Sequence, residues 1–127
     1  MSAIQCIKAG GEHMFEGLTK FIPDLEDGKN TERTISKLED AVYGFIHDHP
    51  ECGLKYYRDI LKSRGVNLDK TPLSEVDAPS VGWLGVMGLL TAAVSEERRS
   101  CGKMKALYEN GSLLRWLVEL KKADEAR

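Results

Sequence analysis

The chain has 127 residues, the length of one domain, and its 42% hydrophobic and 30% charged residues are typical of a soluble globular protein. A formal net charge of −2 excludes a protein whose main role is to coat nucleic acid, although it allows a local basic patch. Three cysteines without a framework spacing indicate reduced thiols, and the absence of an apolar signal segment predicts a cytoplasmic location.

The first part of the chain is expected to form two amphipathic helices. Apolar residues recur at steps of three and four over residues 12–22 and predict the first helix, which Pro23 is expected to end. Residues 24–30 are expected to be a loop. The second helix is predicted to run from Thr31, as its N-cap, to just before Pro50. Residues 1–11 belong to the same single domain and are expected to be poorly ordered.

A third helix is predicted over residues 54–64, with Gly65 in the left-handed position that follows a helix. Residues 66–76 break every periodic pattern and form the longest irregular stretch. Long loops in small domains are often functional, so this segment is a candidate recognition loop. The alternative is that it only crosses the end of the bundle.

The most informative segment lies between Asp77 and Glu96, because it contains no charged residue. A helix that is apolar on nearly every side needs neighbours on nearly every side, so we predict a buried central helix over about residues 78–101, with Asp77 as its N-cap. Its uncharged part, residues 81–94, would be about 20 Å long. That is shorter than a helix that spans a bilayer, so no membrane is expected as a partner.

A stripe of small residues runs along this central helix and consists of Gly85, Gly88 and Ala92. Glycine inside a helix costs about 1 kcal/mol relative to alanine, and close approach of another helix would compensate for that cost. The neighbouring helix could belong to the same chain or to a second copy in a homo-oligomer. Both alternatives remain open at this point.

The C-terminal part is expected to hold a short helix over residues 103–109, a turn at Asn110 and Gly111, and a last helix capped by Ser112. No segment alternates strictly between apolar and polar residues, as a half-buried strand would. The sequence therefore predicts an all-α fold. We expect one compact domain over residues 1–127, a bundle of five or six helices around the buried central helix.

Several fragments carry a family resemblance. They are FIP at 21–23, VYGFI at 42–46, YRDIL at 57–61, ER at 97–98 and NGSLLRWL at 110–117. Together they resemble an uncharacterised bacterial family of small helical proteins, known as domain of unknown function 6508. The resemblance implies a helical domain found in bacteria or their mobile elements. It carries over no active site, and residues 24–30 are shorter than the matching segment of that family.

The densest group of potential metal ligands is HDHPEC at residues 47–52, with His47, His49 and Cys52. Imidazole and thiolate suit zinc, and His13 or Cys6 would complete the set. On a helix, however, His47 and His49 lie about 200° apart, and the spacing matches no established zinc pattern. We therefore expect no metal and no cofactor. A metal- or thiol-dependent enzyme around these residues is a weaker alternative.

Two surface features are candidates for partner binding. Arg98, Arg99, Lys103 and Lys105 form a local basic cluster suited to phosphate or an acidic partner. Adjacent side chains on a helix point about 100° apart, so Tyr56 is expected to be exposed if the next tyrosine faces inward. Exposed tyrosines are favoured anchors at protein interfaces.

The sequence contains no Gly-rich phosphate loop, HExxH or GxSxG motif, which favours a role other than catalysis. We expect a small bacterial protein that binds another protein as an interaction or regulatory module, through Tyr56, residues 66–76 and the basic cluster. By analogy alone, it would be an accessory or inhibitor protein of a mobile element. The main alternative is a nucleic-acid or phosphate-binding domain that uses the basic cluster.

Overall fold

The computed structural model describes residues 14–126, so the segment 1–11, His13 and Cys6 lie outside the described residues. Over this range the fold is all-α and contains no strand, which confirms the predicted fold class. The helices are α1 (Glu16–Thr19), α2 (Ile22–Asp27), α3 (Thr31–Asp48), α4 (Tyr57–Ser63), α5 (Ala78–Arg99), α6 (Lys103–Glu109) and α7 (Ser112–Glu125). Short 3-10 turns stand between them: η1 (Pro50–Cys52), η2 (Leu54–Tyr56) and η3 (Leu73–Glu75).

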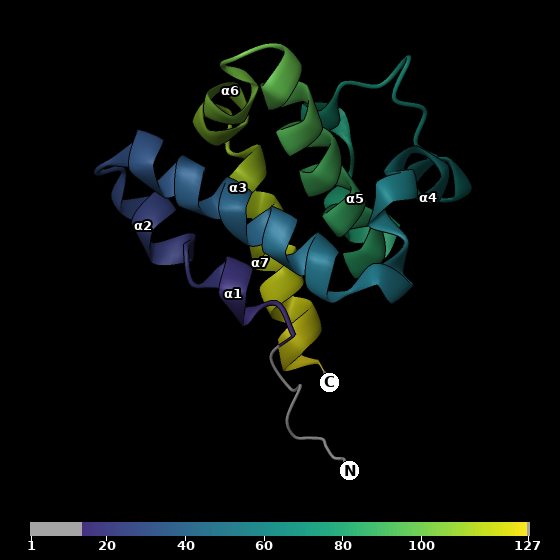
Figure 1. The fold of residues 1–127 in the computed structure, drawn as a ribbon, viewed down its shortest axis with the longest axis horizontal. Coiled ribbons are helices and arrows are strands. Elements are labelled where there is room, and N and C mark those ends of the chain that lie inside the picture. The colour runs from purple at the N-terminus through teal and green to yellow at the C-terminus, as the bar shows by residue number, and fades with distance from the viewer. Residues whose placement is uncertain (1–13, 127) are drawn as a thin grey trace.

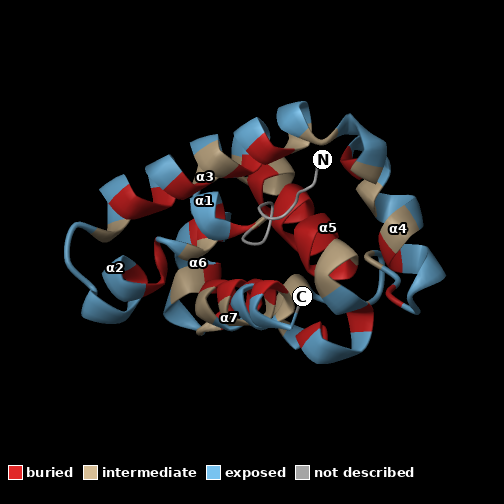
Figure 2. Cartoon of the chain, turned by 90° about the horizontal axis from the view of Figure 1, so that it is seen from below, coloured by how far each residue is buried: buried red, intermediate tan, exposed pale blue. Residues whose placement is uncertain are grey.

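Helix α5 is the centre of the bundle, as predicted. Every residue from Gly85 to Val94 is buried, and α3, α4, α6 and α7 all pack against this helix. Figure 2 shows the buried residues running along α5 and along the sides of α3, α4 and α7 that face it. The largest fully buried side chains come from almost every element of the bundle: Phe15, Leu18, Leu38, Leu54, Leu61, Met87, Leu89, Leu90, Met104, Leu113, Trp116 and Leu117.

The length of α5 is greater than the uncharged segment indicates. The helix continues into a charged last turn and so reaches 22 residues. By length and composition alone, a helix of this kind could cross a membrane. However, 67% of its most apolar window is buried inside this chain. Burial, rather than shortness, is therefore the reason to regard α5 as the core helix of the bundle.

The prediction for residues 12–30 is wrong in its boundaries. Helix α1 already ends at Thr19, and Pro23 lies in the first turn of α2 instead of ending a helix. Proline is tolerated there because the first amides of a helix have no acceptor inside the helix. Residues up to Asp27, expected to be a loop, are therefore helical, and Gly28 ends α2 with a φ of 74°.

The next two helices follow the prediction more closely. Helix α3 begins at Thr31, but the N-cap position belongs to Asn30, and the Thr31 hydroxyl donates to the Gly28 carbonyl at 3.2 Å. The segment predicted as a helix over residues 54–64 opens with the η2 turn and becomes α-helical at Tyr57. Gly65 follows it with a φ of 85°, as its predicted left-handed position requires.

A kink at Gly82 divides the start of α5 from its long straight part. Gly82 has φ 71° and ψ 175°, a combination that glycine alone adopts readily. At this point Arg64 Nη1 donates to the Val81 carbonyl at 2.8 Å and so supplies a donor where the helix is interrupted. The kink also brings Val81 close to Gly85. A Cβ added at Gly85 would lie only 2.5 Å from the Val81 Cβ.

The small-residue stripe of α5 faces α4 of the same chain. A Cβ added at Gly88 would lie 3.3 Å from Leu61 Cγ, and one added at Gly85 would lie 3.1 Å from Arg64 Cδ. The glycines thus allow Leu61 and Arg64 to approach α5 closely. This contact decides between the two neighbours considered for the stripe, the same chain and a second copy. The neighbour is a helix of the same chain.

The C-terminal elements confirm the predicted bounds of α6 and the predicted last helix, α7. Ser112, expected to cap α7, is instead its first residue, and the Asn110 Oδ1 accepts the Ser112 amide at 2.9 Å. The start of α6 is held by Glu97, whose carboxylate accepts the amides of Gly102 at 3.1 Å and Met104 at 2.9 Å. Side-chain acceptors therefore satisfy amides at both helix starts.

The beginning of α1 and the end of α7 lie side by side, as Figure 1 shows in purple and yellow. The amide of Phe15 donates to Asp124 Oδ2 at 3.0 Å, and both residues are buried. This hydrogen bond satisfies the buried amide and one of the two carboxylate oxygens, whereas Asp124 Oδ1 is buried with no partner among residues 14–126.

Candidate functional site

Three tyrosines lie where α3 and α4 flank the C-terminal half of α5, and each has a basic side chain over its ring. Arg98 Cζ lies 5.9 Å from the ring centroid of Tyr43, Lys55 Nζ 5.1 Å from that of Tyr56, and Arg58 Cζ 5.9 Å from that of Tyr57. These distances are typical of cation–π contacts. We call these six residues the tyrosine–cation face.

The packing of α3 and α4 on α5 explains why these residues share a surface. The Tyr43 hydroxyl donates to the Val94 carbonyl at 3.4 Å, so Tyr43 stands at the level of the last turns of α5. On the other side, Leu61 of α4 contacts Gly88. Leu61 lies at the level of Gly88 and Arg64 at the level of Gly85, so the two helices run in opposite directions. Tyr57 precedes Leu61 by one helical turn and therefore lies about one turn past Gly88, toward the C-terminal end of α5.

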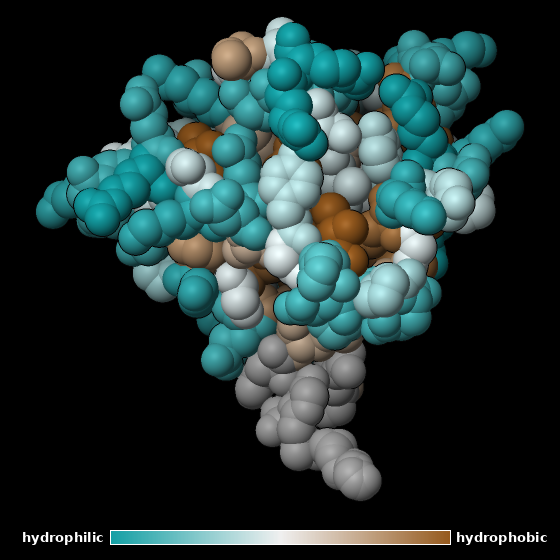
Figure 3. All heavy atoms as spheres, in the orientation of Figure 1, coloured by the Kyte–Doolittle hydropathy of each residue, from teal (hydrophilic) through white to brown (hydrophobic). Residues whose placement is uncertain are grey.

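Exposure distinguishes this surface from the rest of the described chain. Tyr43 is 38% exposed and Tyr56 is 59% exposed, and they are the exposed large hydrophobic residues in the range 14–126. Ile46 and Ile60 are partly buried beside them. Figure 3 shows apolar surface between α3 and α4, surrounded by hydrophilic side chains. An apolar centre within a charged rim is the usual composition of a protein-binding surface.

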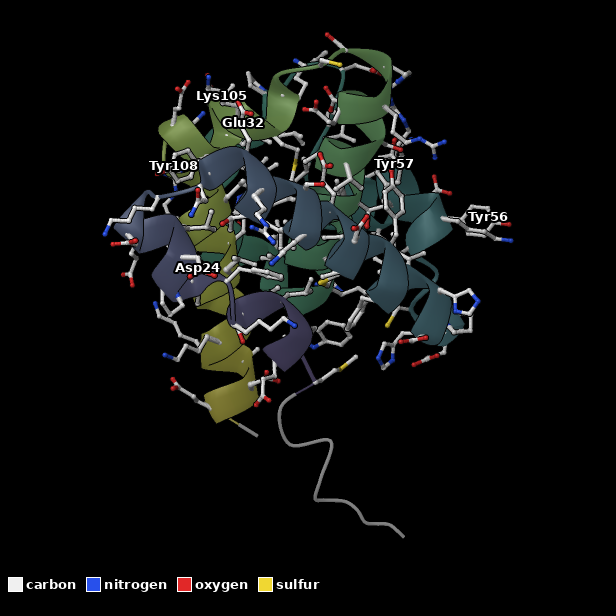
Figure 4. All side chains as sticks on the ribbon, turned by 60° about the vertical axis from the view of Figure 1, so that its left-hand side comes forward. Asp24, Glu32, Tyr56, Tyr57, Lys105 and Tyr108 are labelled. Carbon is white, nitrogen blue, oxygen red and sulfur yellow. The ribbon has the colours of Figure 1, made fainter. Side chains whose placement is uncertain are left out.

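The members of the predicted basic cluster point in different directions. Its members are Arg98, Arg99, Lys103 and Lys105. Arg98 lies over Tyr43, and Lys103 Nζ instead pairs with Glu96 Oε1 at 3.7 Å. Lys105 follows Lys103 by two positions on α6 and therefore points about 200° away from it. Figure 4 shows Lys105 beside Tyr108, at the opposite edge of the molecule from the tyrosines of α4.

The HDHPEC segment places its potential ligands apart. His49 packs its ring against Phe45, with centroids 4.3 Å apart, and its Nδ1 lies 3.0 Å from Glu51 Oε2. The His47 side chain is 90% exposed, and its Nδ1 lies 3.4 Å from Asp48 Oδ1. Between residues 14 and 126, no three His, Cys, Asp or Glu side chains form a group that could hold a metal ion.

Cys52 is the sequence-predicted thiol in this segment, and the structure gives it a half-buried place. Burial raises the pKa of the Cys52 thiol, and the negative charge of Glu51 raises it further. A raised pKa favours the protonated thiol, whereas a nucleophile needs the thiolate. Cys101, the other cysteine that the structure describes, is exposed after the end of α5.

A pocket of about 390 Å³ lies beneath the loop that the sequence singled out. We call it the loop pocket; its lining consists of Leu68, Asp69, Lys70, Thr71, Pro72, Leu73, Ser74, Glu96, Lys103, Ala106, Leu107 and Asn110. Backbone turns order the loop, since Asn67 accepts the amides of Lys70 and Thr71. Arg115 Nη2 also donates to the Ser74 carbonyl at 3.2 Å. The loop and Lys103, considered separately in the sequence, therefore meet in one pocket.

One carboxyl near the tyrosine–cation face is electrostatically unfavourable. Burial raises the pKa of Glu39, and the charges of Glu97 and Asp40 raise it further. Because its pKa is higher in the folded state than in the unfolded chain, the ionised form destabilises the fold. The stabilising contribution of the protonated form is present at low pH and is lost as the pH rises through the folded pKa.

We therefore expect Glu39→Gln to raise the free energy of unfolding at pH 7 by less than about 1 kcal/mol, since the group is mostly solvated. The gain should shrink as the pH falls below about 4, where the wild-type carboxyl is protonated in both states. Urea unfolding at both pH values measures this, with Glu26→Gln on exposed α2 surface as the control. A loss of stability in Glu39→Gln at pH 7 would contradict the explanation.

Comparison with known proteins gives no relative for this arrangement: no family model, no curated protein and no solved structure matches the chain. The sequence singled out Tyr56 and Arg98 of this face but neither Tyr43 nor Arg58. Tyr43 follows the buried Val42 directly, and this position beside an apolar stripe was a usable signal.

Proposed function

We propose that this protein is a non-enzymatic interaction module that binds another protein through the tyrosine–cation face. The observation that carries the proposal is the exposure of Tyr43 and Tyr56 with a basic side chain over each ring. Tyrosine and arginine are enriched among the residues that dominate binding energy, because a large, stiff ring gains contact area at low entropic cost. The proposed bacterial setting is supported by the sequence resemblance alone.

A nucleic-acid ligand would use some of the same chemistry, since bases stack on tyrosine and phosphates pair with arginine or lysine. Such a ligand also needs a continuous basic track for its backbone. The opposite directions of Lys103 and Lys105 on α6, together with the net charge of −2, weaken this alternative. A protein partner needs no such track and is therefore favoured.

The test uses the immobilised full chain and an extract of the cells that produce it. We expect Tyr56→Ala and Tyr43→Ala each to reduce retention of a specific partner by about 30-fold or more, as truncation of a central interface tyrosine does. Tyr108→Ala is the matched control, because Tyr108 is a half-buried tyrosine on α6, away from this face. Circular dichroism and urea unfolding establish that each variant is folded.

Two results would contradict the proposal. The first is a partner that both tyrosine variants retain as well as wild type does. The second is a partner whose retention is lost after nuclease treatment of the extract, which would favour the nucleic-acid alternative. A partner that survives nuclease and is lost with Tyr56→Ala but kept with Tyr108→Ala would support it.

A further inference from the structure

We propose that the loop pocket binds a small zwitterion with an apolar side chain, of the chemical class of the apolar α-amino acids. The pocket is a separate feature from the tyrosine–cation face, and nothing in the proposed function depends on it. Its volume of about 390 Å³ is within the range of small-molecule sites, which begins near 300 Å³.

The polar part of the pocket has opposite charges side by side. Glu96 Oε1 and Lys103 Nζ are 3.7 Å apart, a long distance for an ion pair, and their side chains are 31% and 51% exposed. Such a solvated pair is worth little by itself, so exchanging it for contacts with a ligand costs little. Glu96 would accept from a ligand ammonium group, and Lys103 would donate to the adjacent carboxylate.

The charge of the whole lining agrees with a ligand of zero net charge. Glu96 and Lys103 contribute one charge of each sign, and so do Asp69 and Lys70 at the rim, where the Asp69 side chain is 87% exposed and lies 3.8 Å from Arg58 Nη1. A purely anionic ligand would face the two carboxylates of the lining, and a purely cationic ligand would face its two lysines. A zwitterion instead meets a partner of opposite charge at each end.

Apolar side chains supply the other part of the lining. Leu68, Leu73, Ala106 and Leu107 line the pocket, and Leu107 is only 6% exposed. An aliphatic ligand side chain placed against them would be removed from water, which favours binding. This combination of one apolar wall and one zwitterionic edge selects for amino acids with side chains such as that of leucine.

The loop that lines the pocket is held in place by contacts with the rest of the chain. Arg115 donates to the Ser74 carbonyl at 3.2 Å, and Arg58 Nη1 lies 3.8 Å from Asp69 Oδ1. Asn67 Oδ1 accepts the Asp69 amide at 2.9 Å and fixes the first turn. A pocket that is already formed spares the ligand much of the entropic cost of ordering the loop.

The experiment is an NMR titration of the full chain with L-leucine, N-acetyl-L-leucine and L-leucinamide. We expect L-leucine to shift amides of residues 67–74 and 103–110. Each analogue lacks one charge and should bind about tenfold or more weakly than L-leucine, as expected for loss of one hydrogen bond to a charged group. Equal binding of all three compounds, or no shift with L-leucine at millimolar concentrations, would overturn the proposal.

Variants identify the pocket as the site. Ala106→Trp fills the pocket from an exposed position of α6 and should abolish the L-leucine shifts, and Lys103→Gln should remove the preference for L-leucine over L-leucinamide. Lys105→Gln on the other side of α6 is the matched control and should leave binding unchanged. Binding that survives Ala106→Trp in a folded protein would place the ligand elsewhere and overturn the assignment.

Discussion

Replacement of Trp116 by alanine is expected to lower the free energy of unfolding by about 3–5 kcal/mol, the range for removal of a buried aromatic side chain. Trp116 is completely buried in the middle of α7, where this helix packs against α5. Removal of its indole leaves a cavity that the surrounding leucines fill only in part. Urea unfolding of the full chain measures the loss, and Leu114→Ala on the half-exposed side of α7 is the control, with a smaller loss.

A second variant at the same position separates volume from hydrogen bonding. The Trp116 Nε1 is buried and has no acceptor within residues 14–126. An unpaired buried donor costs free energy, so Trp116→Phe removes this cost together with part of the ring. We expect the loss for Trp116→Phe to be less than half of the loss for Trp116→Ala. Equal losses would show that the indole N–H is bonded in solution.

Replacement of Gly85 by alanine is expected to destabilise the fold by about 1–3 kcal/mol, the range for forcing an extra group into a packed core. The new Cβ would lie 2.5 Å from the Cβ of Val81, whose position the kink at Gly82 determines. Gly82→Ala should have a similar cost, because a φ of 71° with a ψ of 175° is accessible almost only to glycine.

Gly44 provides the matched control, since it is also a glycine inside a helix. A Cβ added at Gly44 would meet no atom within 4 Å, and α3 is regular there. Gly44→Ala should therefore stabilise the protein by about 0.5–1 kcal/mol. Thermal and urea unfolding of the three alanine variants should give opposite signs for Gly44 and for the two glycines of α5. If Gly85→Ala were also stabilising, the kink would not exist in solution.

Periodicity predicts the helices that bury a continuous stripe. The apolar stripes of α3 and α7 and the uncharged run of α5 indicate their helices directly, and the turn residues around α6 define its bounds. Pro23 shows where local signals fail. Proline is compatible with both the end of one helix and the first turn of the next, so its position alone cannot decide between them.

The kink at Gly82 was also outside the reach of pattern reasoning. The stripe of Gly85, Gly88 and Ala92 suggested one close neighbour, yet its two glycines have different roles. Gly88 makes room for Leu61 of α4, whereas Gly85 makes room for Val81 of its own helix. Only the backbone conformation at Gly82 separates the two, and a regular helical projection cannot represent it.

The candidate surfaces were predictable only in part. The exposure of Tyr56 was predictable, because its neighbour Tyr57 packs partly against the core. The contact of Arg98 with Tyr43 joins residues 55 positions apart and depends on how α3 packs on α5. Proximity in sequence suggested a single basic cluster, but α6 turns Lys103 and Lys105 to different sides.

The hydrogen bond from Phe15 to Asp124 connects residues 109 positions apart. Any fraying of the last turn of α7 therefore releases the first amide of the α1 segment at the same time. Deuterium uptake at Phe15 should consequently follow that of the C-terminal turn rather than that of α2. Exchange of the Phe15 amide, near one end of residues 14–126, thus reports on the opening of the helix turn near the other end.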